Sequence, residues 1–369
     1  MRFGVPLPQF GPHAAEADVA ARIARVATTA DRLGYDVLWT AEHLILPHEI
    51  RTPYPYGDRF PFPTTAPILE VVSTLSYVAA LTRRIRLSSS VMVLPYRHPV
   101  VFAKELATLD VLSGGRVLVG VASGWLTEEF DMLGVPFRER GARMDEYLDV
   151  LRILWTEERV TFRGRFVQLE QAAFFPKPIQ KPHPPIWIGG GRAAFERIVR
   201  AGNGWIAAPR PTVSELARDI TELKALAERR YRDPVGIGVA SGGAARNVDE
   251  LLARLPELER VGVTIVSVPA IFWARTVDHA LELLAEFAEK AGLGPMARGA
   301  WRALRSRIAA FMRRIGAAAG WWAECGGRAC IRCGTTGTGW RRTTRSPTPT
   351  GRSSSATSTP WCSGHSSPW

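Results

Sequence analysis

Cysteine is absent from the first 295 residues of this 369-residue chain, because all four cysteines lie after Pro295. The same 295 residues contain no apolar run of 18 or more, and their 35 basic residues nearly balance 34 acidic ones. These absences exclude a disulfide scaffold and a membrane-spanning helix, and they argue against nucleic acid as a partner. No apolar signal region opens the sequence. We therefore expect a cytoplasmic protein that acts on a small-molecule substrate.

The formal charge of +12 comes almost wholly from the last 74 residues, which contain 12 arginines, no lysine and one acid. Within them, residues 296–320 have apolar side chains at helical spacing, which predicts a basic amphipathic helix. Residues 321–369 have almost no aliphatic side chains and cannot bury enough apolar surface to fold. We expect them to be low-complexity, and either disordered or a frame-shifted extension. Their single C-x-x-C, at Cys330 and Cys333, lacks the second pair that a zinc site needs.

Common catalytic motifs are also missing from residues 1–295. This part of the chain has no metal-ligand spacing, no G-x-S-x-G elbow and no G-x-G-x-x-G fingerprint. No side chain is an obvious nucleophile. The combination indicates that a cofactor supplies the difficult chemistry and that no metal takes part.

Strand-like and helix-like segments alternate eight times along residues 1–295. The predicted strands are 2–7, 36–41, 85–94, 116–121, 185–188, 204–207, 235–240 and 263–268. Residues 161–175 interrupt the pattern as a hairpin or an irregular loop. Eight such units favour a (β/α)8 TIM barrel over a doubly wound open sheet, whose roughly six strands would leave helices unplaced.

The loops after the strands are the candidate sites, because barrel active sites lie at the C-terminal ends of the strands. After the second strand, His43 could position or transfer a proton, or it could be a hydrogen-bonded rim histidine. Its neighbour Glu42 either orients it or ends the strand. In the third strand, Ser89, Ser90 and Val91 indicate a bulge that turns backbone groups toward a planar ring, or serines that fill a crowded layer.

Two further loops contain glycines that would allow a ligand to approach closely. Ser123-Gly124-Trp125 follows the fourth strand and would suit a flat ligand, with a core tryptophan as the alternative. Gly189-Gly190-Gly191 follows the fifth strand and opens into a helix, where free N–H groups and Arg192 could bind a phosphate. A plain tight turn is the alternative reading of these glycines.

The segment from Leu44 to Pro67 is long for a loop inside a compact domain. It contains six prolines and four aromatic residues, Tyr54, Tyr56, Phe60 and Phe62. Loops of this length are usually functional, so we expect it to cover the site and to help choose the substrate.

Several stretches resemble the luciferase-like monooxygenase superfamily, and among its members the coenzyme F420-dependent oxidoreductases. They are MRFGVPLPQFG, GYDVLWTAEHLILP, RIRLSSSVMVLPYRHPVVFAKELATLDVLSGGR, VGVASGWLTEEFDMLGVPFRERGARMDEYLDVLRILW, PKPIQKPHPPIWIGGG and AGNGW. They occur in consistent order over about residues 1–290.

The resemblance implies a barrel that binds coenzyme F420 or FMN at the C-terminal ends of its strands. It implies that His43 is the catalytic residue beside the reactive ring, and that a cis peptide bond at Ser90-Val91 supports the back of the ring. Ser123-Gly124-Trp125 would lie beside the ring, and Gly189-Gly190-Gly191 would bind the phosphate. Related sugar-phosphate dehydrogenases have a glutamate where this chain has Trp125, which argues against sugar phosphates as substrates.

We therefore expect an oxidoreductase that transfers a hydride between coenzyme F420 and a small organic substrate. An FMN-dependent monooxygenase that uses O2 is the second hypothesis, and a non-catalytic flavin-binding protein is the third. The resemblance also implies a homodimer.

Overall fold

The computed structural model describes residues 1–208, 211–242 and 244–294. They all belong to one compact unit. The expected amphipathic helix at 296–320 and the low-complexity segment 321–369 lie outside the described residues. No helix in the described ranges is long and apolar enough to cross a lipid bilayer.

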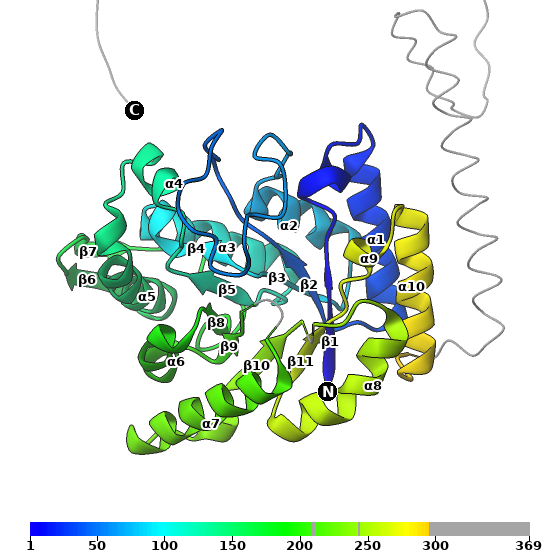
Figure 1. Cartoon of the computed structure of the whole chain (residues 1–369). Helices are drawn as coiled ribbons and strands as arrows, with labels where there is room; N and C mark the ends of the chain where they lie inside the picture. Colours follow the sequence, from blue (N-terminus) through cyan, green and yellow to red (C-terminus); the bar gives the residue numbers. More distant parts are fainter. Residues whose placement is uncertain (209–210, 243, 295–369) are drawn as a thin grey trace, which may run out of the picture. The chain divides into compact units, whose positions relative to one another are not determined.

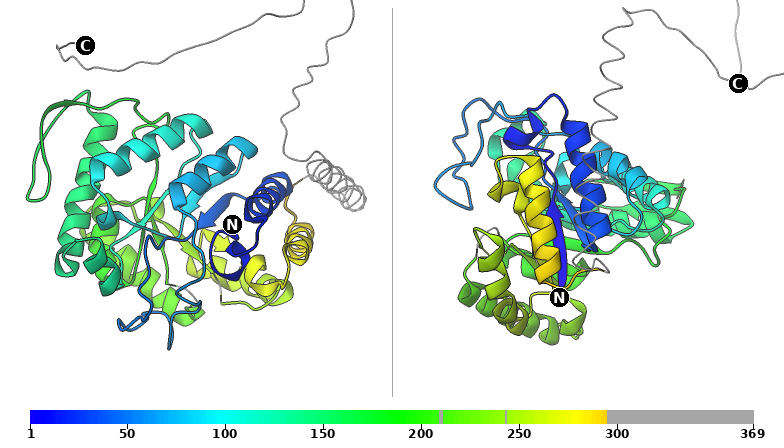
Figure 2. Two further views of the ribbon diagram at one scale, coloured as in Figure 1. Left: turned by 90° about the horizontal axis from the view of Figure 1, so that it is seen from above. Right: turned by 90° about the vertical axis from the view of Figure 1, so that its right-hand side faces the viewer.

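Parallel strands form a barrel surrounded by helices, which confirms the predicted fold class (Figures 1 and 2). Its strands are β1 (Arg2–Pro6), β2 (Val37–Thr40), β3 (Arg86–Ser89), β4 (Met92–Val93), β5 (Val119–Ala122), β8 (Ile186–Gly189), β9 (Gly204–Ile206), β10 (Gly238–Ser241) and β11 (Ile265–Ser267). Hydrogen-bonded neighbours follow the order β3-β2-β1-β11-β10-β9-β8-β5-β4. The end strands β3 and β4 are two halves of one predicted strand, and a bridge between Leu87 and Val117 joins β3 to the segment before β5. These pairings close the ring.

A helix follows each strand position on the outside of the barrel (Figure 2). The helices are α1 (Val19–Leu33), α2 (Val71–Leu81), α3 (Pro99–Ser113), α4 (Thr127–Met132), α5 (Arg140–Thr156), α6 (Phe195–Ala201), α7 (Val213–Arg229), α8 (Val248–Val261), α9 (Ala270–Trp273) and α10 (Val277–Lys290). The interruption that we expected at 161–175 is an antiparallel hairpin of β6 (Arg159–Arg163) and β7 (Gln168–Ala173). The short helices α4 and α9 are additions that the sequence pattern did not predict.

Local signals explain where the helices begin and end. Gly34 and Gly114 adopt left-handed conformations, with φ of 88° and 70°, and end α1 and α3. Pro99 begins α3, where its missing N–H leaves no hydrogen bond unmade. The first helix starts at Val19, after a separate 3-10 turn at Gly11–Ala14.

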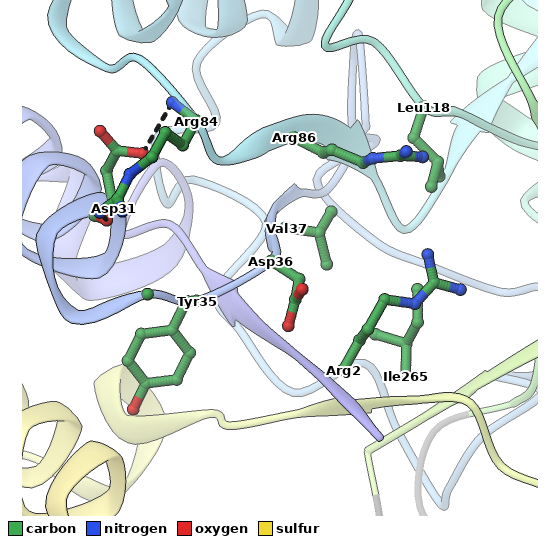
Figure 3. Close-up of a pocket in the computed structure, with 10 residues that line it drawn as sticks. Arg2, Asp31, Tyr35, Asp36, Val37, Arg84, Arg86, Leu118 and Ile265 are labelled. Atoms are coloured by element: carbon green, nitrogen blue, oxygen red, sulfur yellow. Dashed lines mark hydrogen bonds between the residues drawn. The ribbon is translucent and has the colours of Figure 1, made fainter. Parts of the chain in front are cut away.

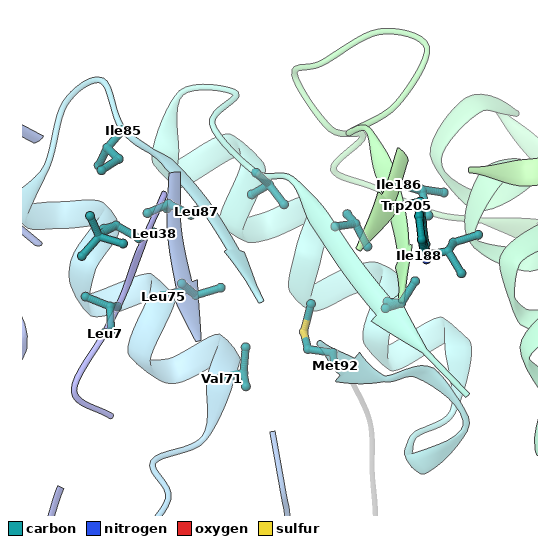
Figure 4. Packing of buried hydrophobic residues seen from close by; sticks show 14 of the residues in the cluster. Leu7, Leu38, Val71, Leu75, Ile85, Leu87, Met92, Ile186, Ile188 and Trp205 are labelled. Carbon is teal, nitrogen blue, oxygen red and sulfur yellow. The ribbon is translucent and has the colours of Figure 1, made fainter. Parts of the chain in front are cut away.

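Apolar side chains pack on both faces of the barrel wall. Consecutive residues of a strand point to opposite faces, so in β2 Leu38 packs outward against the helices while Val37 and Trp39 fill the interior. Figure 4 shows part of the outer layer around Leu38, Leu75 and the neighbouring strands. Because both faces are covered, the strands read as apolar runs rather than as alternating ones.

Gly120 in β5 lies against the broken third strand. A Cβ atom added there would be 1.9 Å from the carbonyl oxygen of Ser89, and that oxygen belongs to the main chain. We therefore expect Gly120→Ala to lower the free energy of unfolding by about 3 kcal/mol, since backbone has to move. Chemical denaturation measures the change. Gly236→Ala, at a position with nothing within 4 Å, is the matched control. A loss below about 1 kcal/mol for Gly120→Ala would contradict this close approach.

Candidate active site

The predicted site residues follow the ends of four parallel strands, so they share one rim of the barrel. His43 follows β2, and Ser90-Val91 lies between β3 and β4. Ser123-Gly124-Trp125 directly follows β5, and Gly189-Gly190-Gly191 begins at the last residue of β8. The structure brings them together in two pairs. The rings of His43 and Trp125 are 6.0 Å apart, and a Cβ on Gly189 would be 2.9 Å from Val91 Cγ1.

The third strand breaks at a cis peptide bond between Ser90 and Val91, as the resemblance implied. Around this bond, the Ser90 N–H donates to the Thr40 carbonyl at 2.7 Å. The Ser89 hydroxyl donates to the Gly120 carbonyl at 2.7 Å and accepts from the Met92 N–H at 2.9 Å. The strand is therefore interrupted here, and the Ser89 hydroxyl is satisfied inside the wall. That the break turns backbone groups toward a planar ring stays a prediction.

A buried carboxylate holds the His43 ring. His43 Nδ1 lies 2.6 Å from Glu129 Oε2, and Glu129 is 0 % exposed. The same carboxylate accepts the Tyr96 hydroxyl at 2.8 Å and the N–H groups of Leu44 and Ile45 at 2.6 and 3.2 Å. Burial raises the pKa of Tyr96, and the Glu129 charge raises it further, so this hydroxyl stays protonated and donates.

The hydrogen-bond donors around Glu129 determine which nitrogen of the His43 ring carries the hydrogen. Because ionised Glu129 can only accept, the hydrogen between Glu129 and His43 belongs to Nδ1. In the neutral ring, Nε2 then has a free lone pair, and in the imidazolium it carries a proton. Within the described part of the chain, no group is hydrogen bonded to Nε2. His43 is therefore oriented to accept or donate a proton at Nε2.

Glu42 does not orient His43, which corrects one of the two readings of that residue. Its Oε1 lies 2.7 Å from Arg97 Nη2, and its Oε2 accepts the Val93 N–H at 2.6 Å. Burial raises the pKa of Glu42, while the Arg97 guanidinium opposes that shift. Glu42 thus links the end of β2 to β4, next to the cis peptide bond.

Aromatic rings from the 44–67 loop lie against the His43 and Trp125 rings. Phe60 is 5.4 Å from His43 and 6.2 Å from Trp125, and Tyr54 is 5.3 Å from Trp125. The row continues from Phe60 through Phe62, at 6.1 Å, to Phe10 after β1. These side chains are only half-buried despite their contacts. The loop therefore presents a partly open aromatic surface beside the histidine.

Adjacent acids of α4 attach this loop to the barrel. Glu129 holds the loop where it leaves β2, and Glu128 accepts the N–H groups of Arg51 and Thr52 at 2.8 and 3.0 Å. Glu128 also accepts the Thr52 hydroxyl at 2.6 Å. Burial opposes ionisation of Glu128, but the hydrogen bonds from Thr52 and Arg51 outweigh it and lower the pKa to about 2.

Loss of the Glu128 charge is expected to loosen the loop. Since its folded-state pKa lies below the usual 4.5, the anchoring is complete above that value and is lost as pH falls toward about 2. At neutral pH, Glu128→Gln should speed tryptic cleavage after Arg51 and Arg59 by about tenfold, because local opening precedes cleavage. Limited proteolysis followed by mass spectrometry measures these rates. Glu49→Gln, in the same exposed loop, is the control, and equal rates for both variants would rule out the anchor.

The indole of Trp205 fixes the Gly189–Gly191 turn by a hydrogen bond. Trp205 Nε1 donates to the Gly190 carbonyl at 2.7 Å, and nothing lies within 4 Å of a Cβ placed on Gly191. Contrary to our expectation, Arg192 does not face this turn. Its guanidinium pairs instead with Asp219 at 2.9 Å and with Glu222 at 3.1 Å. The main chain alone remains to bind an anion at the turn.

Glu129 is the site residue that the sequence reasoning missed. It stands in Thr127-Glu128-Glu129, directly after the Ser123-Gly124-Trp125 loop. Two acids in the first turn of α4 were the available signal, but acids are common in first turns because they favour the helix dipole. The contact with His43 joins residues 86 positions apart and becomes visible only in the fold.

Comparison with known proteins agrees with this architecture. The sequence profile of the family "Luciferase-like monooxygenase" matches residues 1–250. An uncharacterised protein of Mycobacterium tuberculosis is 36% identical over 249 residues, which cover 66% of this chain and 85% of that protein. The monooxygenase RslO1 of Streptomyces bottropensis has a similar structure, with a TM-score of 0.66 and 25% identity over 78% of this chain and 98% of its own.

Curated relatives with named activities use two different cofactors. The F420-dependent glucose-6-phosphate dehydrogenase of Amycolatopsis mediterranei is 31% identical over 204 residues, or 54% of each chain. The FMNH(2)-dependent dimethylsulfone monooxygenase of Pseudomonas putida is 30% identical over 184 residues, or 49% of this chain and 50% of that enzyme. The profile match covers more than half of the sequence. The chain belongs to the luciferase-like monooxygenase family, and it is an oxidoreductase.

Proposed function

We propose that the protein transfers a hydride between coenzyme F420 and a small organic substrate, with His43 handling the accompanying proton. The observation that carries the proposal is the buried Glu129 carboxylate on His43 Nδ1, which leaves Nε2 free at the rim of the barrel. A ring fixed in this way suits general acid–base catalysis. It has no evident use in a protein that only carries a flavin.

The rim has features that fit a flat cofactor with a phosphate tail. Gly191 has open space beside it and Gly190 is fixed by Trp205, so main-chain N–H groups there can approach a phosphate. Gly189 packs against Val91, which brings the glycine turn next to the cis peptide bond. We propose that Ser90-Val91 and Ser123-Gly124-Trp125 hold the ring and that Gly189-Gly190-Gly191 holds the phosphate.

The bound deazaflavin would accept or donate the hydride, and the chain's own residues would do the rest. His43 Nε2 would donate a proton to a substrate oxygen during reduction, or remove it during oxidation. Glu129 would keep the ring oriented, and the half-buried Phe60 and Trp125 would exclude water from the reacting groups.

The aromatic surface of the loop indicates the substrate class. Tyr54, Phe60 and Trp125 offer ring faces and edges beside His43, which favours a planar, uncharged organic compound over a sugar phosphate. Menadione, an uncharged planar quinone, is a suitable test acceptor, because its reduction takes up a hydride and a proton.

An FMN-dependent monooxygenase is the second candidate. The similarity to the FMNH(2)-dependent dimethylsulfone monooxygenase favours it, and RslO1 is also a monooxygenase. Oxidation of each reduced cofactor, with and without O2 and with menadione, separates the two functions. The proposal predicts enzyme-dependent oxidation of reduced coenzyme F420 that needs menadione and not O2. Substrate oxygenation that needs reduced FMN and O2 would instead establish the monooxygenase. The homodimer stays a prediction.

A further inference from the structure

A cavity lies at the N-terminal end of the barrel, on the opposite side from the candidate active site. Its volume is about 330 Å³, and it is lined by residues at the beginnings of β1, β2, β3 and β11 (Figure 3). Its inner wall is apolar, formed by Val37, Leu118 and Ile265 from the barrel interior. The rest of its lining is mostly polar and consists of Arg2, Asp31, Gly34, Tyr35, Asp36, Arg84 and Arg86.

Arg2 and Arg86 both lie on the inward face of their strands, at the N-terminal end of the barrel where Arg86 is exposed. A Cβ on Gly4 would collide with the Trp39 and Val37 side chains, so Gly4 faces the interior, and Arg2, two residues earlier in β1, faces the same way. Arg86 pairs in register with Val37, an interior residue, and lies on the same face. Figure 3 shows the two guanidinium groups extending toward the same side of the cavity, near Leu118.

The acids of the cavity wall accept hydrogen bonds from main-chain N–H groups. Asp36 Oδ2 accepts the Phe3 N–H at 2.8 Å, and Asp31 accepts main-chain N–H groups, including that of Ile85 at 2.8 Å. Arg84 is turned away, since its guanidinium donates to the Asp31 carbonyl at 2.7 Å.

Among the described residues, Arg2 and Arg86 nevertheless have no carboxylate at ion-pair distance, although the Asp36 charge is near Arg2. In the ranges that the structure describes, neither guanidinium forms an ion pair or a side-chain hydrogen bond. Burial lowers the pKa of Arg2, and the nearby Arg86 charge lowers it further, although Asp36 opposes this. Two like charges facing one cavity with an apolar wall form an arrangement that an anion would stabilise.

We propose that this cavity binds a tetrahedral dianionic oxyanion, a phosphate group, between Arg2 and Arg86. Each of the two guanidinium groups offers a planar fork of N–H donors to the oxygens of the dianion. The Arg2 guanidinium lies 6.0 Å from the centre of the Trp187 ring, which supports its orientation. The site is independent of the hydride-transfer chemistry at the other end of the barrel.

Calorimetric titration of the full chain tests the site, with inorganic phosphate and glycerol phosphate as ligands at constant ionic strength. Arg86→Met, at an exposed position, should weaken binding about tenfold or more, because it removes a charge-assisted fork. Arg2→Lys keeps the charge and should weaken binding severalfold. Arg229→Met, which removes an exposed charge at the end of α7, should leave binding unchanged.

The same experiment separates the sources of the phosphate group. Binding of inorganic phosphate supports the site and identifies the free ion as sufficient, whereas binding of glycerol phosphate alone supports a phosphate monoester. Absence of binding for both ligands would overturn the proposal. Binding that survives Arg86→Met but disappears with the Gly191→Ala variant would place the anion at the opposite rim and would also overturn it.

Discussion

His43→Ala is expected to lower turnover by about 100-fold or more while leaving the affinity for the cofactor within about twofold of wild type. The buried Glu129 carboxylate lies 2.6 Å from Nδ1 of His43 and fixes the ring. The proton can then move to or from Nε2, and the alanine variant has no group that replaces this nitrogen. Steady-state kinetics with reduced coenzyme F420 and menadione measures the turnover. Fluorescence titration measures the affinity.

A second substitution and a control make this prediction sharper. His43→Gln retains an N–H donor within reach of Glu129 but lacks a titratable nitrogen, so it should be as inactive as His43→Ala. His48→Ala removes an exposed histidine of the same loop and should behave as wild type. Full turnover by His43→Gln would remove His43 from the proton-transfer step.

Glu129→Gln is expected to lower turnover by about 10- to 100-fold, the same range as for removing a carboxylate that orients a metal-bound histidine. The amide has one acceptor oxygen where the carboxylate has two, so the four donors around Glu129 cannot all be satisfied. The cofactor affinity should change little, because Glu129 acts through His43. The kinetics described for His43→Ala measure both quantities.

The tautomer of His43 distinguishes a positioning role from a merely structural one. Nitrogen-15 NMR of the imidazole should show hydrogen on Nδ1 in the wild type and a shift toward the Nε2–H tautomer in Glu129→Gln. Tyr96→Phe removes a donor to the same carboxylate but leaves the His43 contact, so its turnover should fall by less than about threefold. An unchanged tautomer in Glu129→Gln would contradict the positioning role.

The barrel could be predicted from the sequence because its signals are local. Alternating apolar segments, Gly34 and Gly114 after helices, and Pro99 at a helix start each act within a few residues. The break of the third strand was harder to define. Ser89, Ser90 and Val91 allowed two readings, and the structure shows that Ser89 is satisfied inside the wall while the Ser90-Val91 bond interrupts the strand.

The site could be predicted only in part, because the carboxylate that holds His43 comes from helix α4, in a distant part of the chain. His43 was recognisable from its place after a strand, and the resemblance supplied the cofactor roles of the glycine and serine loops. Glu129 was not recognisable, since a carboxylate that binds a ring 86 residues away leaves no spacing signal. The same holds for Arg192, whose partners Asp219 and Glu222 belong to α7.

Equilibrium titration of the purified protein with coenzyme F420, and separately with FMN, tests the central claim most directly. We predict saturable binding of coenzyme F420 at least about tenfold tighter than that of FMN, a difference of about 1.4 kcal/mol. Gly191→Ala should weaken binding of coenzyme F420, because its new side chain enters the open space beside the glycine turn. Tight binding of FMN with no binding of coenzyme F420 would contradict the account.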